Sequence, residues 1–195
     1  MEEQVIHITP QIGKVIRKRK KVKITFFKRK EKKRKDEQAE QRETLRPVVA
    51  EKKVFEDAFM DIQEGLLALC MEFAEDVPVD EVFAYGSIET DAYSFNAFYV
   101  KDGQVLTTNK INVDLPTIRE FLQIGGKDLV KLEKLCKEYG RPTPTELRLH
   151  YTVDGGHLDT HYEYESVCGP ESGISPTKVF LDWRESVGEE LRKKQ

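Results

Sequence analysis

The segment ELRLHYTVDGGHLDTHYEYE, residues 146–165, decides the fold. Polar and apolar side chains alternate along it on both sides of Gly155-Gly156, a pattern typical of a half-buried β-hairpin. With the two glycines as the loop, we predict strands Glu146–Val153 and His157–Glu165. On the core surface, this register sets four residues of the first strand, Val153, Tyr151, Leu149 and Leu147, against Leu158, Thr160, Tyr162 and Tyr164.

The other surface of this predicted hairpin is polar and faces solvent. The same register sets Thr152 against Asp159, His150 against His161, and Arg148 against Glu163, with Glu165 beyond. The two imidazoles and the carboxylates of Asp159 and Glu163 are residue types that bind zinc, and Glu163 with His150 could act as a general acid and base. A flat solvent face, however, offers neither converging elements nor supporting hydrogen bonds. We therefore expect no catalytic residues, no metal and no cofactor.

The sequence before the hairpin predicts a helix and three strands. Apolar residues recur every three or four positions from about Glu51 to Asp76, which predicts an amphipathic helix. Its opposite side is an acidic ridge that includes Asp57, Asp61 and Glu64. Three β-rich segments follow, Glu81–Ile88, Tyr93–Val100 and Val105–Ile111. Asp102-Gly103 favours a type I′ turn between the last two, which pairs Val100 with Val105.

Two more helices complete the predicted order. One begins near Lys127 and ends at Gly140, and Gly125-Gly126 separates it from a shorter helical piece, Leu115–Ile124. The last helix has Ser175 as its N-cap and Pro176 in its first turn, with Phe180, Trp183 and Val187 on one face. The fold class predicted is α+β, an antiparallel sheet with helices in the order α-β-β-β-α-β-β-α.

Charge divides the chain into two unlike parts. Residues 1–47 carry 16 Lys or Arg against 7 Asp or Glu, a net +9, whereas residues 48–195 carry 16 against 28, a net −12. Lys14 to Lys35 holds 14 basic residues among 22, so we expect residues 1–47 to be a mobile basic tail and linker before one acidic domain. Lys21–Phe26 alternates with period two, and can form a strand if a partner surface neutralises its charge.

Several classes of protein are disfavoured because the sequence lacks the motifs that characterise them. The longest apolar run, Leu66–Met71, has six residues, against the roughly 20 that cross a bilayer, and we read no signal peptide near Met1. Nucleophile and phosphate-loop motifs are missing too. The three cysteines, Cys70, Cys136 and Cys168, are widely spaced in apolar or aromatic segments, which favours buried free thiols. We expect a cytoplasmic protein that is not an enzyme.

The order of elements and several aromatic segments resemble a known family. They are the opening helix, Phe95–Tyr99, Tyr162–Glu165, and Ser175-Pro176 leading to Trp183. From about Lys53 to Val187 the chain resembles the YezG-like immunity proteins of bacteria, small acidic α+β antitoxins that neutralise a nuclease toxin. The basic tail lies outside the resemblance.

The resemblance implies inhibition without chemistry, in which an acidic surface occupies the cationic groove of a cognate nuclease toxin. The residues that it implies for the toxin-facing surface are acidic side chains of the hairpin and the last helix: Asp154, Asp159, Glu163, Glu165, Asp182 and Glu185.

Two other functions stay open at this point. The first is a nucleic-acid-binding module that acts through Lys14 to Lys35, whose cations could also bind another anionic surface. The second is a small metal-dependent hydrolase that uses His150 and His161. Strong salt dependence that is lost with the tail would indicate the first, and bound metal the second.

Overall fold

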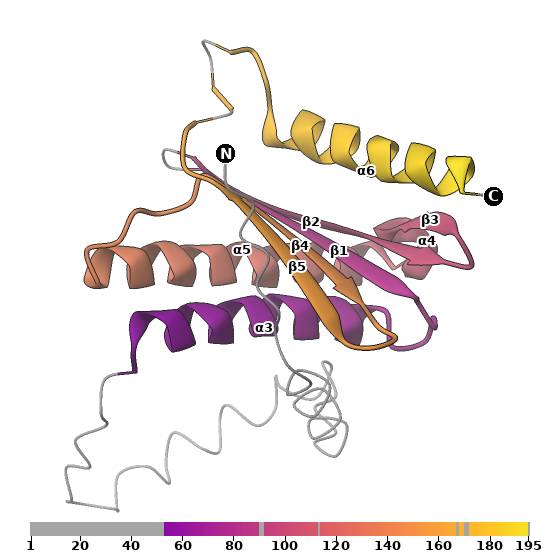
Figure 1. Cartoon of the computed structure of the whole chain (residues 1–195), viewed down its shortest axis with the longest axis horizontal. Coiled ribbons are helices and arrows are strands. Elements are labelled where there is room, and N and C mark those ends of the chain that lie inside the picture. The colour runs from indigo at the N-terminus through magenta and orange to yellow at the C-terminus, as the bar shows by residue number, and fades with distance from the viewer. Residues whose placement is uncertain (1–52, 90–91, 113, 167, 170–171, 195) are drawn as a thin grey trace, which may run out of the picture.

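The computed structural model describes residues 53–194, apart from residues 90–91, 113, 167 and 170–171. The predicted basic tail, with Lys14 to Lys35 and the alternating segment Lys21–Phe26, lies outside the described residues, as does the predicted helix start at Glu51. In the described part, five strands form one antiparallel sheet in the order β3-β2-β1-β4-β5. Helices α3 and α5 lie side by side on one face of this sheet, and α6 lies on the other (Figure 1).

The α+β class and the predicted order of elements are confirmed, with one short helix added. In chain order the elements are α3 Phe55–Phe73, β1 Glu81–Glu89, β2 Ala92–Lys101, β3 Gln104–Thr107, α4 Thr108–Ile111, α5 Leu115–Glu138, β4 Glu146–Thr152, β5 His157–Glu163 and α6 Pro176–Lys193. No helix in the described residues is both long and apolar enough to pass through a membrane.

The central strand β1 is buried on both faces because helices cover both. Val82 and Ala84 point into the larger core, between the sheet and helices α3 and α5. Phe83 and Tyr85 point the other way, into a smaller aromatic core beneath α6 that contains Phe180. A strand buried on both sides reads as a continuous apolar run, as β1 does.

The turn between β2 and β3 has the predicted geometry. Asp102 and Gly103 both have positive φ, 50° and 69°, as a type I′ turn requires, and Val100 pairs with Val105. The predicted strand Val105–Ile111 is nevertheless too long, because the chain turns into α4 after Thr107. Three successive polar residues, 108–110, leave no apolar side to continue the alternation, and the Asn112 N–H bonds the Thr108 carbonyl at 2.9 Å instead.

Gly125 and Gly126 do not interrupt a helix, contrary to the prediction. Helix α5 runs without a break through both. The physical reason lies in packing, because a Cβ placed on Gly125 would be 2.0 Å from Cδ1 of Phe95, whose ring lies against the helix backbone. Gly140 does close the helix as predicted, with φ 63° and the Arg141 N–H bonded to the Cys136 carbonyl at 2.9 Å.

The hairpin forms, but its predicted register is wrong by two residues. Leu149 lies opposite Thr160, and His150 lies opposite Asp159 instead of His161. The loop is four residues long, 153–156, because Thr152 pairs with His157 and the two glycines, with φ 82° and 68°, form only its second half. A shift of two residues keeps every side chain on its predicted face, so Leu149 remains in the core. Tyr164, predicted to be in the core, lies beyond the end of β5 and is 53% exposed.

The start of α6 agrees with the prediction. Ser175 is the N-cap, and its Oγ accepts a hydrogen bond from the Lys178 N–H at 3.2 Å, with Pro176 at the first position of the helix. Phe180 is buried, and Trp183 and Val187 pack beside it against the sheet. Helix α6 packs over β1, β2 and β3. Strands β4 and β5 therefore lie to one side of this helix.

Candidate functional site

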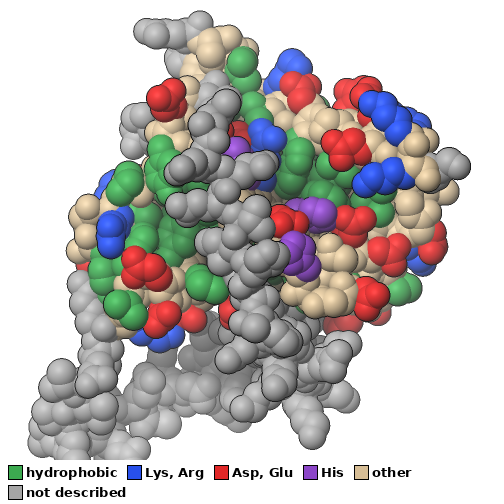
Figure 2. Space-filling view, in the orientation of Figure 1, with side chains coloured by type: hydrophobic (Ala, Val, Ile, Leu, Met, Phe, Trp, Pro, Cys, Tyr) green, Lys and Arg blue, Asp and Glu red, His purple; other side chains and the backbone are tan. Residues whose placement is uncertain are grey.

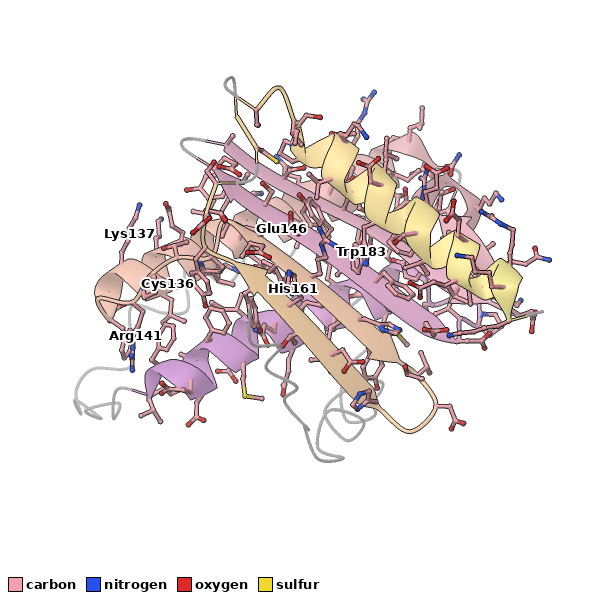
Figure 3. All side chains as sticks on the ribbon, turned by 45° about the horizontal axis from the view of Figure 1, so that its top comes forward. Cys136, Lys137, Arg141, Glu146, His161 and Trp183 are labelled. Carbon is pink, nitrogen blue, oxygen red and sulfur yellow. The ribbon has the colours of Figure 1, made fainter. Side chains whose placement is uncertain are left out.

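The candidate site is the set of polar side chains that β4 and β5 present on the same side of the sheet as α6. We call this surface the hairpin polar face: Glu146, Arg148, His150, His157, Asp159, His161 and Glu163. Histidine and carboxylate side chains gather on this side of the molecule (Figure 2). Glu146 and His161 lie on the hairpin strands beside the helix that carries Trp183 (Figure 3).

At the turn end of the hairpin polar face, histidines and carboxylates alternate. The Nε2 atom of His150 lies 2.5 Å from Oε2 of Glu81 on β1, and its Nδ1 lies 3.9 Å from Oδ2 of Asp159. His157 approaches the other oxygen of Asp159 at 3.0 Å. The His150 ring stacks on Phe83 with a centroid distance of 4.2 Å, so packing from below holds this group in place.

At the opposite end lies an ion pair whose carboxylate is buried. Glu146 is 2% exposed, and its Oε1 accepts a hydrogen bond of 2.6 Å from Nε of Arg148. The guanidinium of Arg148 sits over the Trp183 ring, 5.4 Å from its centroid, and thereby joins β4 to α6. Tyr85 donates a weaker bond of 3.4 Å to the same carboxylate. Burial, reinforced by Glu146, raises the pKa of Tyr85.

The predicted toxin-facing residues fall into two groups. Asp154 is exposed in the β4–β5 turn and Glu165 is exposed beyond β5, while Asp159 and Glu163 are half-buried on β5. Each of these two β5 carboxylates lies next to a histidine, with Glu163 3.1 Å from His161. These four residues follow one strand and its ends.

The other two predicted residues, on α6, do not join this group. Asp182 is exposed and forms an i,i+4 ion pair with Lys178 at 2.7 Å. Glu185 lines a cavity of about 540 Å³ between α6 and the β2–β3 turn, together with Arg184 and Arg192. Since β3 and β5 are opposite edges of the sheet, Glu185 faces away from the hairpin carboxylates.

The geometry also bears on the metal and acid–base hypotheses. The predicted pairing of His150 with His161 does not occur, and the neighbour of Glu163 is His161 instead of His150. In the part of the chain that the structure describes, no three His, Cys, Asp or Glu side chains come close enough together to hold a metal ion.

The acidic ridge of α3 is exposed but partly neutralised from outside the helix. Asp57 and Asp61 are exposed, and Asp61 forms an ion pair with Lys53. Arg141, which follows α5, lies 3.4 Å from Glu56. The cations that pair with this ridge, Lys53 and Arg141, therefore lie outside α3 in the sequence, one before the helix and one far beyond it.

The sequence reasoning missed Glu81 and Glu146. A glutamate at the start of a strand is normally exposed, so the local pattern places both in solvent. Glu146 can be buried because its carboxylate accepts hydrogen bonds from Arg148, two residues later on the same face, and from Tyr85 of β1. The i,i+2 spacing of opposite charges within β4 is the one sequence signal that indicates this pair.

The three cysteines are buried free thiols, as predicted. Desolvation raises the pKa of Cys70, Cys136 and Cys168. A raised pKa disfavours the reactive thiolate, so none of these thiols has the environment of a nucleophile.

No protein-family model matches this chain, and no curated protein matches it. The resemblance to YezG-like immunity proteins stays a prediction.

Proposed function

We propose that this chain is a binding protein without catalytic activity, an immunity protein that neutralises a cationic nuclease by covering its nucleic-acid groove. The observation that carries the proposal is the line of carboxylates along β5 and its ends: Asp154, Asp159, Glu163 and Glu165. Asp159 and Glu163 project from β5, at one edge of the sheet in the described residues, and Asp154 and Glu165 lie beyond its two ends, where a partner can approach from the side.

The charge of residues 48–195 supports the same proposal. A net charge of −12 attracts a positively charged partner over a distance of about one Debye length, roughly 8 Å at physiological salt, and speeds its association. A nuclease must present cations to the phosphates of its substrate, so its active groove is a target of the right sign. Contacts that then exclude water hold the complex and set its dissociation rate.

The rigidity of the hairpin suits this function. Asp159 lies between His157 and His150, and His150 is fixed by its stacking on Phe83. A carboxylate that is already oriented loses less conformational freedom on binding than one on a mobile loop. The choice of a nuclease, among cationic partners, rests on the family resemblance.

The experiment is capture of partners by the full chain from its native cell, followed by a nuclease assay of each captured protein. We expect one captured protein to degrade nucleic acid and to lose that activity when an equimolar amount of this chain is added. Captured proteins without nuclease activity, or a nuclease that keeps its activity in the complex, would refute the proposal. Recovery of nucleic acid alone would favour the basic tail as the functional part.

A further inference from the structure

Strand β5 forms one edge of the sheet. In the part of the chain that the structure describes, its only strand neighbour is β4. In an antiparallel pair, alternate residues direct their backbone N–H and C=O groups away from the partner, so one side of β5 offers hydrogen bonds to a further strand. Native proteins rarely leave such an edge bare, because it can template pairing with another chain.

The side chains of β5 define what a further strand should look like. One side of the strand carries Asp159 and Glu163 on the hairpin polar face, and the other carries Leu158 and Tyr162 toward the larger core. A matching strand would place cations on the first side and apolar residues on the second. It would thus alternate Lys or Arg with Val, Ile or Phe.

The sequence contains one such segment in its own basic part, KVKITF at Lys21–Phe26. Lys21 and Lys23 share one side of an extended chain, and Val22, Ile24 and Phe26 share the other. We propose that Lys21–Phe26 pairs with the outer edge of β5 in the same molecule as a sixth strand, with its lysines beside Asp159 and Glu163.

The connection is long enough for this pairing. Phe59, in the second turn of α3, contacts Tyr162 of β5 with a centroid distance of 5.7 Å, so the start of the described chain lies near this edge. Residues 27–52, 26 in number, lead to it. A flexible chain of that length spans on the order of 30 Å, whereas a seven-residue strand such as β5 is about 23 Å long.

Tethering favours this occupant over a separate molecule. A segment tethered over 26 residues can reach an effective concentration in the millimolar range, which a second copy of the chain rarely matches. The inference is independent of the proposed function. If both hold, a cationic partner must compete with Lys21 and Lys23 for the same carboxylates.

The direct test is residue-resolved amide hydrogen exchange of the full chain, measured by NMR. We expect the outward-facing amides of β5 and the amides of Val22 and Ile24 to exchange at least tenfold more slowly than in unstructured peptides. Ile24→Pro, which removes a donor and disfavours a strand, should abolish this protection, while Lys33→Pro, outside the segment, should preserve it. Unprotected amides in the wild type, or protection of β5 that survives Ile24→Pro, would overturn the proposal.

A charge exchange tests the side-chain pairing. Lys21→Glu with Lys23→Glu should remove the protection, and Asp159→Lys with Glu163→Lys in the same chain should restore at least part of it. Failure of this restoration in a folded quadruple variant would contradict the proposed arrangement. Protection that appears only as protein concentration rises, together with a dimer in sedimentation, would assign the segment to a second copy and likewise overturn pairing within one molecule.

Discussion

Nε of Arg148 donates a 2.6 Å hydrogen bond to Glu146, two residues away on the same face of β4. The carboxylate is almost fully buried, while the guanidinium is partly exposed and sits over Trp183. One pair of opposite charges, at one end of the hairpin polar face, therefore connects β4 to α6.

Removing either member of this pair should have unequal effects on stability. Arg148→Ala leaves a buried carboxylate without its cation and removes a contact with Trp183, so we expect a loss of about 1–3 kcal/mol. Glu146→Gln keeps an acceptor for Arg148 and Tyr85 and should cost less than about 1 kcal/mol. Urea unfolding followed by circular dichroism measures both. Equal losses, or a larger loss for Glu146→Gln, would mean that the ion pair does not stabilise the fold.

The adjacent glycines of α5 form a matched pair for a packing test. Gly125→Ala forces a methyl group into the Phe95 ring and should destabilise the protein by about 1–3 kcal/mol through overpacking. Gly126→Ala meets open space in the same helix and should stabilise it by up to about 1 kcal/mol. Thermal unfolding of the two variants distinguishes them. Similar shifts of the same sign would show that the ring does not rest on Gly125.

The buried thiols predict a loss of stability in alkali. Burial raises the pKa of Cys70, Cys136 and Cys168 above the value of about 8.5 for an exposed thiol. The thiols of the unfolded chain therefore lose protons first, and stability that is complete below about pH 8.5 declines as pH rises toward the folded-state pKa values. Each thiol contributes at most about 1.4 kcal/mol per pH unit.

The measurement is the free energy of unfolding between about pH 8 and pH 10, below the ordinary pKa of tyrosine. Replacing all three cysteines with Ala lowers the overall stability, because buried volume is lost, but should flatten the slope in this interval. A triple variant with the wild-type slope would show that other groups cause the decline.

The elements that the sequence predicted well are those defined by local patterns. Apolar spacing located α3 and α6, and Asp102-Gly103 fixed both the turn type and the pairing of Val100 with Val105. These features depend on a few neighbouring residues, whose conformational preferences decide the outcome locally.

The errors arose where distant residues decide. Gly125 looks like a helix break until the Phe95 ring from β2 is known to lie against it. The hairpin register depends on how β4 and β5 pair along their whole length, which places Thr152 opposite His157 and leaves a four-residue loop that Gly155-Gly156 alone does not indicate. Within the candidate site, alternation alone could place Asp159 and Glu163 on one face together with His157 and His161, their neighbours on the same strand. The contact of Asp159 with His150 could not be predicted, because it crosses the hairpin and depends on the register.

Reversal of the hairpin charges addresses the proposed mechanism. Asp159→Lys, Glu163→Lys and Glu165→Lys change exposed or half-buried positions on one face, so the cooperative melt should persist with little change. Asp57→Lys with Asp61→Lys on α3 is the control, since it reverses charge on the other side of the sheet. Neutral Asp159→Asn and Glu163→Gln variants separate lost attraction from new repulsion.

The most direct measurement is inhibition of the captured nuclease by the wild type and by the hairpin variant, over a range of salt concentrations. We predict that the folded hairpin variant loses at least tenfold in inhibition and that the α3 control keeps most of it. We also predict that inhibition by the wild type weakens as salt increases, because charges at the rim of an interface govern its association rate. A folded hairpin variant that inhibits as strongly as the wild type, with the same salt dependence, would contradict the account.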